Sequence, residues 1–184
     1  MSESKKNILA EWLKAGVLGI ILILFIRTFI FSSYDVDGIS MQPTLQDGDK
    51  LIVNKLSYEF SSFSRFDVIV FHHSSDEDFV KRVIGLPGDS IQYEDDQLIV
   101  NGKKIEEPFL PKKHHLLLGQ KETGDFSLKE ITGKDRVPDN CLFVMGDNRL
   151  GSFDSRHFGF VSMDQVVGKV NVRYWPLDEF YIEL

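Results

Sequence analysis

An uncharged apolar run near the N-terminus constrains the fold of this chain more than any other feature. Residues 15–26 read AGVLGIILILFI, and apolar residues continue through position 31. A membrane-spanning helix needs about 20 residues. Residues 12–31 reach that length if Lys14 and Arg27 extend toward lipid head groups. We therefore expect residues 1–31 to form a cytoplasmic N-terminus and a single transmembrane helix, with residues 32–184 on the far side of the membrane.

Two other interpretations of this run are less consistent with its surroundings. A cleavable secretory leader should be followed by a small-x-small site, whereas residues 32–35 read SSYD. A core helix that is apolar on all faces needs a large host domain, and 184 residues leave room for one ordinary domain plus a short segment. Lys5, Lys6 and Lys14 precede the run, which favours a cytoplasmic N-terminus.

The remaining sequence is typical of a mainly β domain. Short segments rich in β-branched and aromatic residues alternate with turn signals, among them Asp47-Gly48 and Pro87-Gly88. Residues 98–105 read LIVNGKKI, a strong hairpin pattern because Asn101 and Gly102 both tolerate positive φ. Residues 106–138 are polar and predict a loop-rich insertion. The other expected strands are residues 51–53, 67–71, 79–84, 142–145 and 166–175.

Composition excludes several functional classes. The net charge of −7 gives no support to a nucleic-acid partner. The single cysteine, Cys141, excludes an intramolecular disulfide and lies in an apolar run, so we expect a buried core residue. The adjacent histidine pairs 72–73 and 114–115 would point to opposite faces of a strand, and no zinc-binding spacing is present. We therefore expect no metal and no cofactor.

Three polar motifs could carry chemistry. The first is SMQPTL, residues 40–45, which begins with Ser40, the second is residues 79–89, and the third is the loop GDNRLGSFDSRHFG, residues 146–159. In the second motif, strand alternation puts Lys81 on the same face as Phe79 and Val83. Lysines are almost never buried without a partner. Lys81 is either an edge lysine that reaches solvent or a desolvated lysine whose lowered pKa lets it act as a base.

In order and content, the three motifs resemble those of the bacterial type I signal peptidases, in the short single-anchor form typical of Gram-positive bacteria. These serine-lysine peptidases remove signal peptides from exported preproteins. The resemblance implies Ser40 as nucleophile, Lys81 as general base, and Ser152 as the hydroxyl that holds the lysine. It also implies that supporting roles belong to Asp154 and Arg156 as an ion pair, and to Asp147, Asn148 and Arg82.

The family fold implies a coiled antiparallel β-sheet core at about 34–90 and 138–177, with a smaller β-rich insertion at about 91–137. The family cleaves after small-x-small sites such as Ala-x-Ala, and we expect the apolar residues Met41 and Val83 to line shallow pockets for those side chains. The Ser40 backbone N–H is a candidate oxyanion donor. Some relatives have a serine two residues before the nucleophile, but this chain has Gly38, which leaves the second donor open.

The expected partners are signal peptides of exported preproteins and the lipid bilayer. The aromatic residues Tyr58, Phe60, Phe63 and Phe66 either touch lipid head groups or pack in the core. Three alternative functions are weaker. A self-cleaving repressor should have a DNA-binding domain where this chain has an apolar run. A penicillin-binding enzyme needs Ser-x-x-Lys, and no serine at a plausible site here has a lysine three residues on. A non-catalytic peptide-binding module would have no use for both Ser40 and Lys81.

Overall fold

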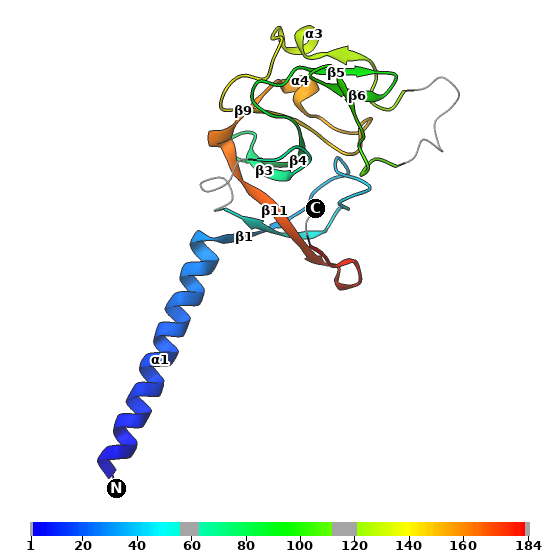
Figure 1. Ribbon diagram of the computed structural model, residues 1–184. Coiled ribbons are helices and arrows are strands. Elements are labelled where there is room, and N and C mark those ends of the chain that lie inside the picture. The colour runs from blue at the N-terminus through cyan, green and yellow to red at the C-terminus, as the bar shows by residue number, and fades with distance from the viewer. Residues whose placement is uncertain (1, 56–62, 112–120, 183–184) are drawn as a thin grey trace.

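The computed structural model describes residues 2–55, 63–111 and 121–182, and in the N-terminal helix it describes the side chains of residues 11–24. Helix α1 (Ser2–Phe29) projects from a β domain (Figure 1) and ends two residues before the predicted limit. Large apolar side chains along it, such as Trp12, Leu18 and Ile23, are exposed. Among the described residues, no helix has the length and apolar character needed to cross a membrane. The transmembrane anchor therefore stays a prediction.

The domain is built on a large antiparallel sheet, which confirms the predicted fold class of a mainly β protein. Its strand order is β1-β2-β11-β3-β4-β9-β10, and β12 pairs with β11. Register shifts in the pairing of β11 with β2 and β3, and of β4 with β9, bend and coil the sheet. The strands are β1 (Phe31–Asp35), β2 (Lys50–Asn54), β3 (Val68–His72), β4 (Asp78–Gly85), β9 (Cys141–Met145), β10 (Val161–Ser162), β11 (Val166–Trp175) and β12 (Tyr181–Ile182).

A second sheet of four strands, in the order β7-β6-β5-β8, lies beyond β4 in the chain. At the β6–β7 turn, Asn101 and Gly102 have φ of 52° and 77°, as the hairpin pattern predicts. The sheet falls within the range predicted for the insertion, whose boundaries stay a prediction. Its strands are β5 (Ile91–Glu94), β6 (Gln97–Val100), β7 (Lys103–Ile105) and β8 (Phe126–Ser127).

Short helical segments complete the domain. They are α3 (Leu128–Thr132), α4 (Ser155–Phe158), and the 3₁₀ turns η1 (Met163–Gln165) and η2 (Leu177–Glu179). Because α3 and β8 lie within residues 106–138, that range contains more regular structure than its polar composition predicts.

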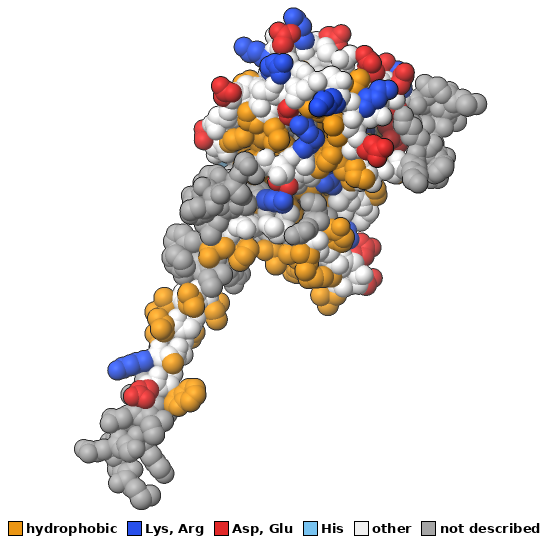
Figure 2. Space-filling model, in the orientation of Figure 1, with side chains coloured by type: hydrophobic (Ala, Val, Ile, Leu, Met, Phe, Trp, Pro, Cys, Tyr) orange, Lys and Arg blue, Asp and Glu red, His pale blue; other side chains and the backbone are white. Residues whose placement is uncertain are grey.

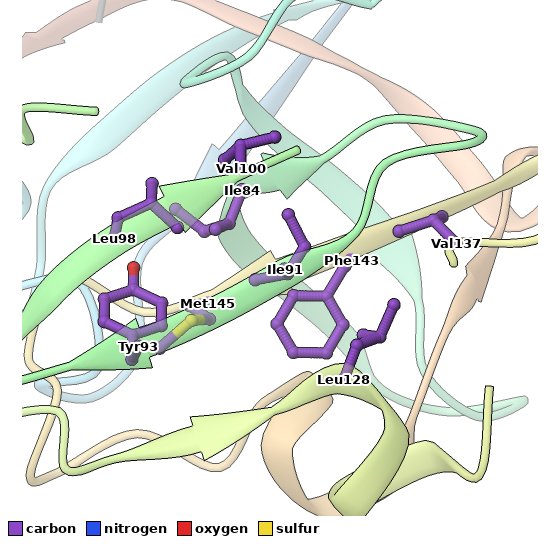
Figure 3. Close-up of a cluster of buried hydrophobic side chains, with 9 residues drawn as sticks. All are labelled: Ile84, Ile91, Tyr93, Leu98, Val100, Leu128, Val137, Phe143 and Met145. Carbon is purple, nitrogen blue, oxygen red and sulfur yellow. The ribbon is translucent and has the colours of Figure 1, made fainter. Parts of the chain in front are cut away.

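Strand β9 joins the two sheets through its alternating side chains. Phe143 and Met145 belong to the cluster drawn in Figure 3, which they share with β5 and β6 of the second sheet. Leu142 and Val144 point the other way and pack with β3 in the main sheet. All four side chains are fully buried. Cys141, at the start of the strand, is only half-buried and packs against the first cluster.

Residues 31–35, directly after the helix, form β1, which pairs along its whole length with β2, so a paired strand joins α1 to the segment that carries Ser40. Of the two alternatives for the aromatic residues, core packing holds for Phe63 and Phe66. Tyr58 and Phe60 lie outside the described residues.

Candidate active site

The segment between β1 and β2 presents Ser40 at the surface of the domain. Gly38 takes a φ of 96°, a value that glycine adopts without strain, and its N–H donates to Asp47 Oδ1 at 2.8 Å. On the other side of Ser40, Met41 and Leu45 are 1% and 0% exposed and anchor the segment in the core. The half-exposed serine is therefore held between a tight turn and a buried apolar pair.

Lys81 reaches Ser40 from the middle of β4. Its Nζ donates to Ser40 Oγ at 2.8 Å and to the Val80 carbonyl at 3.1 Å, and it lies 5.0 Å from the centre of the Phe79 ring. Only 4% of Lys81 is exposed. Burial lowers its pKa to about 8, although the charges of Asp154 and Asp147 partly oppose that shift. The ammonium can therefore lose its proton near neutral pH.

The loop that follows β9 is fixed both to Arg82, the neighbour of Lys81, and to the Ser40 segment. Arg82, next to Lys81, donates to both oxygens of Asp147, at 2.8 and 2.6 Å, and the two side chains are 5% and 0% exposed. Asn148 donates from its backbone N–H to the Ser40 carbonyl at 3.1 Å and from Nδ2 to the Ile39 carbonyl at 3.1 Å. The structure thus brings together these motif residues with the Ser40–Lys81 pair.

A second ion pair supports the far end of the loop. Arg156 donates from Nε and one terminal nitrogen to the fully buried Asp154, both at 2.9 Å, and the Gly146 N–H donates to the same carboxylate at 3.1 Å. Burial alone would raise the pKa of Asp154, but the bonds and charge of Arg156 outweigh it and lower the pKa below its ordinary value. Asp154 also caps α4.

Ser152 lies beside the Ser40 segment, but the hydrogen bond expected from Lys81 is not formed. Its Oγ is buried and forms no hydrogen bond of normal geometry among the described residues, but it lies close enough to Asp154 to help lower the pKa of that carboxyl. A Cβ added at Gly146 would lie 2.3 Å from both Ser152 Oγ and the Ser40 carbonyl oxygen. The approach of these two residues therefore requires a glycine at position 146.

A pocket of about 300 Å³ opens next to Ser40. Met41 lines it as predicted, whereas Val83 does not. Val83 is fully buried two residues further along β4, where it packs with residues of β3 and β9. The wall residues that sequence reasoning missed are Ile39, Phe79, Val80, Gly151 and Phe153, together with Tyr34 to Gly38 and Asp78.

Histidines lie at the edge of this region. His157 is exposed, and its ring stacks on Phe153 at 5.1 Å. His73 stacks on Phe79 at 4.3 Å. Within the described ranges, no group of three or more His, Cys, Asp or Glu residues could hold a metal ion.

Comparison with known proteins agrees with this geometry. Residues 9–175 match the family model described as signal peptidase, peptidase S26. The chain belongs to the signal peptidase I family. The match covers most of the chain and all three motifs, so the resemblance seen in the sequence is confirmed. Members of this family are serine peptidases that act in signal-peptide removal, and the chain is an enzyme of that class.

Individual relatives cover nearly the whole chain. Signal peptidase I of Bacillus caldolyticus is 57% identical over 163 residues, which are 89% of this chain and 90% of that protein. Signal peptidase IB of Staphylococcus aureus strain Mu50 is 40% identical over 179 residues, or 95% and 94% of the two chains. The crystal structure of a signal peptidase I from Enterococcus faecalis superposes with a TM-score of 0.56 at 40% identity, over 59% of this chain and 97% of that one.

The burial of Lys81 predicts a stability cost that a neutral side chain removes. Below pH 8 the lysine is charged in both the folded and the unfolded state, and only the folded state bears the desolvation. Lys81→Met should therefore raise the free energy of unfolding at pH 7, by up to about 3 kcal/mol. The difference in unfolding free energy between Lys81→Met and wild type should shrink as the pH rises from about 8 to 10.5. Over that range Lys81 loses its charge in the folded state before it does so in the unfolded state.

Denaturant unfolding at several pH values measures this difference. Lys103→Met, on an exposed lysine of β7, is the matched control and should leave stability unchanged. A Lys81→Met protein less stable than wild type at pH 7 would contradict a destabilising desolvation.

Proposed function

We propose that Ser40 is the nucleophile and Lys81 the general base of this signal peptidase. The contact that carries the proposal is the 2.8 Å hydrogen bond between Lys81 Nζ and Ser40 Oγ, made where burial brings the lysine pKa to about 8. A serine hydroxyl is a weak nucleophile and needs a base within hydrogen-bond reach. A neutral lysine meets that need in serine-lysine peptidases.

The chemistry proceeds in two stages. Neutral Lys81 takes the Ser40 hydroxyl proton as Oγ attacks the carbonyl carbon of the scissile bond. The resulting ammonium then gives that proton to the leaving amine as the C–N bond breaks, which leaves an acyl ester on Ser40. Lys81, neutral again, removes a proton from water as the water attacks the ester. Lys81 then returns that proton to Ser40 Oγ as the C–O bond of the ester breaks, which releases the signal peptide and restores the Ser40 hydroxyl.

The oxyanion formed in both stages needs hydrogen-bond donors. The Ser40 N–H is one candidate, since among the described residues it donates to no other group. Gly38 has no side-chain donor, and its own N–H is already donated to Asp47. The second donor therefore comes from a residue other than Gly38.

Ser152 is the residue to which we assign the orientation of the Lys81 ammonium. Its buried Oγ lies near Asp154 on the Gly146 side of the Ser40 segment, and it forms no hydrogen bond of normal geometry among the described residues. We assign it the acceptor role for a proton of Lys81, which would orient Nζ toward Ser40. The ion pairs Arg82–Asp147 and Arg156–Asp154 hold the loop that carries this serine.

The Ser40–Lys81 assignment predicts the activity of single variants on a preprotein. Ser40→Ala and Lys81→Ala should abolish cleavage in folded protein. Lys81→Arg should also be inactive, because a guanidinium keeps its proton at any usable pH. Ser152→Ala should lower the rate without abolishing it. Wild-type kcat/KM should rise with pH through an apparent pKa of about 8, since only neutral Lys81 is a base.

Cleavage of a purified preprotein, followed on a gel as a function of pH, measures these rates, and far-UV circular dichroism checks the fold of each variant. Substantial turnover by Lys81→Arg, or a rate independent of pH between 6 and 10, would rule out Lys81 as the base.

The pocket beside Ser40 supports cleavage after small side chains. Met41 forms part of its lining and is 1% exposed, so the lining is held by the core and cannot easily retreat. We propose that this pocket accepts the small residues of an Ala-x-Ala site. Replacing either alanine by phenylalanine in a substrate peptide should stop cleavage, while replacing the middle residue should have little effect. Equal kcat/KM for alanine and phenylalanine at the small positions would refute this specificity.

Apolar surface near α1 supports placement of the domain at a bilayer. Hydrophobic side chains gather on the underside of the domain, beside the helix (Figure 2). We propose that α1 anchors the protein in a single pass, with a cytoplasmic N-terminus, and that the domain rests on the outer surface of the membrane. The exposed apolar residues at the C-terminal end are Trp175, Leu177, Phe180, Tyr181 and Ile182.

Removal of the anchor should separate placement from chemistry. A chain that begins at Ile30 keeps β1 and should cleave a soluble Ala-x-Ala peptide at nearly the full rate. Because enzyme and preprotein no longer share one membrane, cleavage of a preprotein in vesicles should fall by more than 10-fold, as expected when effective concentration is lost. Equal losses on both substrates would assign α1 to folding instead.

A further inference from the structure

Arg149 lies in the same loop as Asp147 and Asn148, but the proposed chemistry gives it no role. It is 4% exposed, and its guanidinium donates to one residue of the second sheet and to two residues of the connection between β7 and β8. One terminal nitrogen contacts Tyr93 Oη at 2.9 Å and Thr123 Oγ1 at 3.1 Å, and the other contacts Glu107 Oε1 at 2.5 Å. Tyr93 is on β5, and its hydroxyl donates to Glu107 at 2.8 Å. Strand β5 and the β7–β8 connection therefore surround this side chain.

The charge of Arg149 is fully compensated. The Arg149 and Glu107 side chains are 2% and 5% exposed. Burial alone would lower the pKa of Arg149, but Tyr93 and Glu107 raise it above the ordinary value, so the guanidinium stays charged. A buried ion pair contributes little net stability, because desolvation offsets the attraction. What it does supply is a fixed arrangement, since the guanidinium is held by several acceptors in different directions.

The other side of Arg149 faces the catalytic loop. Its Nε donates to the Gly146 carbonyl at 3.1 Å, and its own carbonyl accepts from Arg156 at 2.7 Å. The preceding residue, Asn148, donates to the Ser40 carbonyl. Hydrogen bonds from Glu107 to Arg149 and from Asn148 to Ser40, joined by the backbone of the loop, therefore connect Glu107 to the backbone of Ser40.

Phe109 strengthens the same junction. Its ring lies 4.1 Å from the guanidinium carbon of Arg82 and 5.9 Å from that of Arg149. Arg82 holds Asp147, so the β7–β8 connection contacts both Arg82 and Arg149. Movement of this connection relative to the main sheet would displace the loop at two points.

We propose that Arg149 is a positioning residue through which strand β5 and the β7–β8 connection fix the 146–154 loop, so that Ser40 and Lys81 meet in reactive geometry. The inference rests on the proposed Ser40–Lys81 chemistry and extends it to residues outside the pocket. A merely structural Arg149 would change stability and activity together. A positioning Arg149 controls kcat even when stability is restored.

A pair of variants separates these cases in the full-length, detergent-solubilised protein. Arg149→Met leaves Glu107 buried and unpaired, so the melting temperature should fall. Arg149→Met with Glu107→Gln removes both charges and should recover most of that loss. On a synthetic Ala-x-Ala peptide, both variants should keep kcat about 100-fold below wild type with little change in KM, as expected for a displacement of about 1 Å at the reacting groups.

The pH profile gives a second measurement. A displaced loop admits water to Lys81, which weakens the desolvation that lowers its pKa. The apparent pKa of kcat/KM in the double variant should therefore lie above the wild-type value, and the loss should be larger at pH 7 than at pH 9. Arg149→Lys keeps the charge but cannot reach all four acceptors at once, so its kcat should lie between those of wild type and Arg149→Met.

The matched control is Arg65→Met, which removes the Arg65–Asp89 ion pair, 2.9 Å long, and a hydrogen bond to the Ile84 carbonyl, neither of which involves the 146–154 loop. It should lower the melting temperature without changing kcat or the pH profile. Recovery of kcat together with stability in the double variant would overturn the positioning role, provided that Ser40→Ala is inactive. Cleavage by Ser40→Ala would instead overturn the Ser40 assignment, and the inference with it.

Discussion

The contact between a buried lysine and Ser40 Oγ sets the requirements that the rest of the site meets. Lys81 must be desolvated to lose its proton near neutral pH, yet two carboxylates lie close enough to raise its pKa. Each of them is occupied elsewhere: Asp147 by Arg82 and Asp154 by Arg156. Because these carboxylates are already neutralised, their attraction for the ammonium is too weak to cancel the effect of burial. The two ion pairs are therefore electrostatic as well as structural supports.

The hydrogen bond between Lys81 and Ser40 also depends on the relative position of the two sheets. Lys81 belongs to the main sheet, whereas the loop that holds the Ser40 backbone is bound through Arg149 by Tyr93 of the second sheet and by Glu107, which follows β7. Strand β9 links them, because its alternate residues fill the core on each side and its end leads into the loop. Because one strand packs in the cores on both of its sides, the two sheets are fixed in position relative to each other. The second sheet is therefore part of the support of the site and more than a surface insertion.

Local patterns in the sequence predicted the features that depend on neighbouring residues in the chain. The period of the strands and the Asn101-Gly102 turn follow from neighbours within a few residues. The strand pattern predicted the face of Lys81 but left open whether it is buried or reaches solvent, and the structure shows that it is buried. Features that depend on distant partners were missed. Strand β1 follows an apolar run and is defined only by pairing with β2. Arg149 contacts groups 26 to 56 residues away in the chain, so no local pattern could reveal its environment. Val83 has the predicted face but lies too far along β4 to reach the pocket.

The choice of cation at each buried position follows from the same physics. Arg82 and Arg149 each pair with a carboxylate and must stay charged, which a guanidinium does at any usable pH. Lys81 donates only to the neutral oxygens of Ser40 and Val80, and an ammonium in that setting yields its proton. An arginine at position 81 would remain charged beside a hydroxyl that it could not deprotonate. A lysine at position 149 would lack the planar set of donors that joins Glu107, Tyr93 and Gly146 at once. The site thus separates its two needs, fixed charge for positioning and a releasable proton for chemistry, between the two kinds of basic side chain.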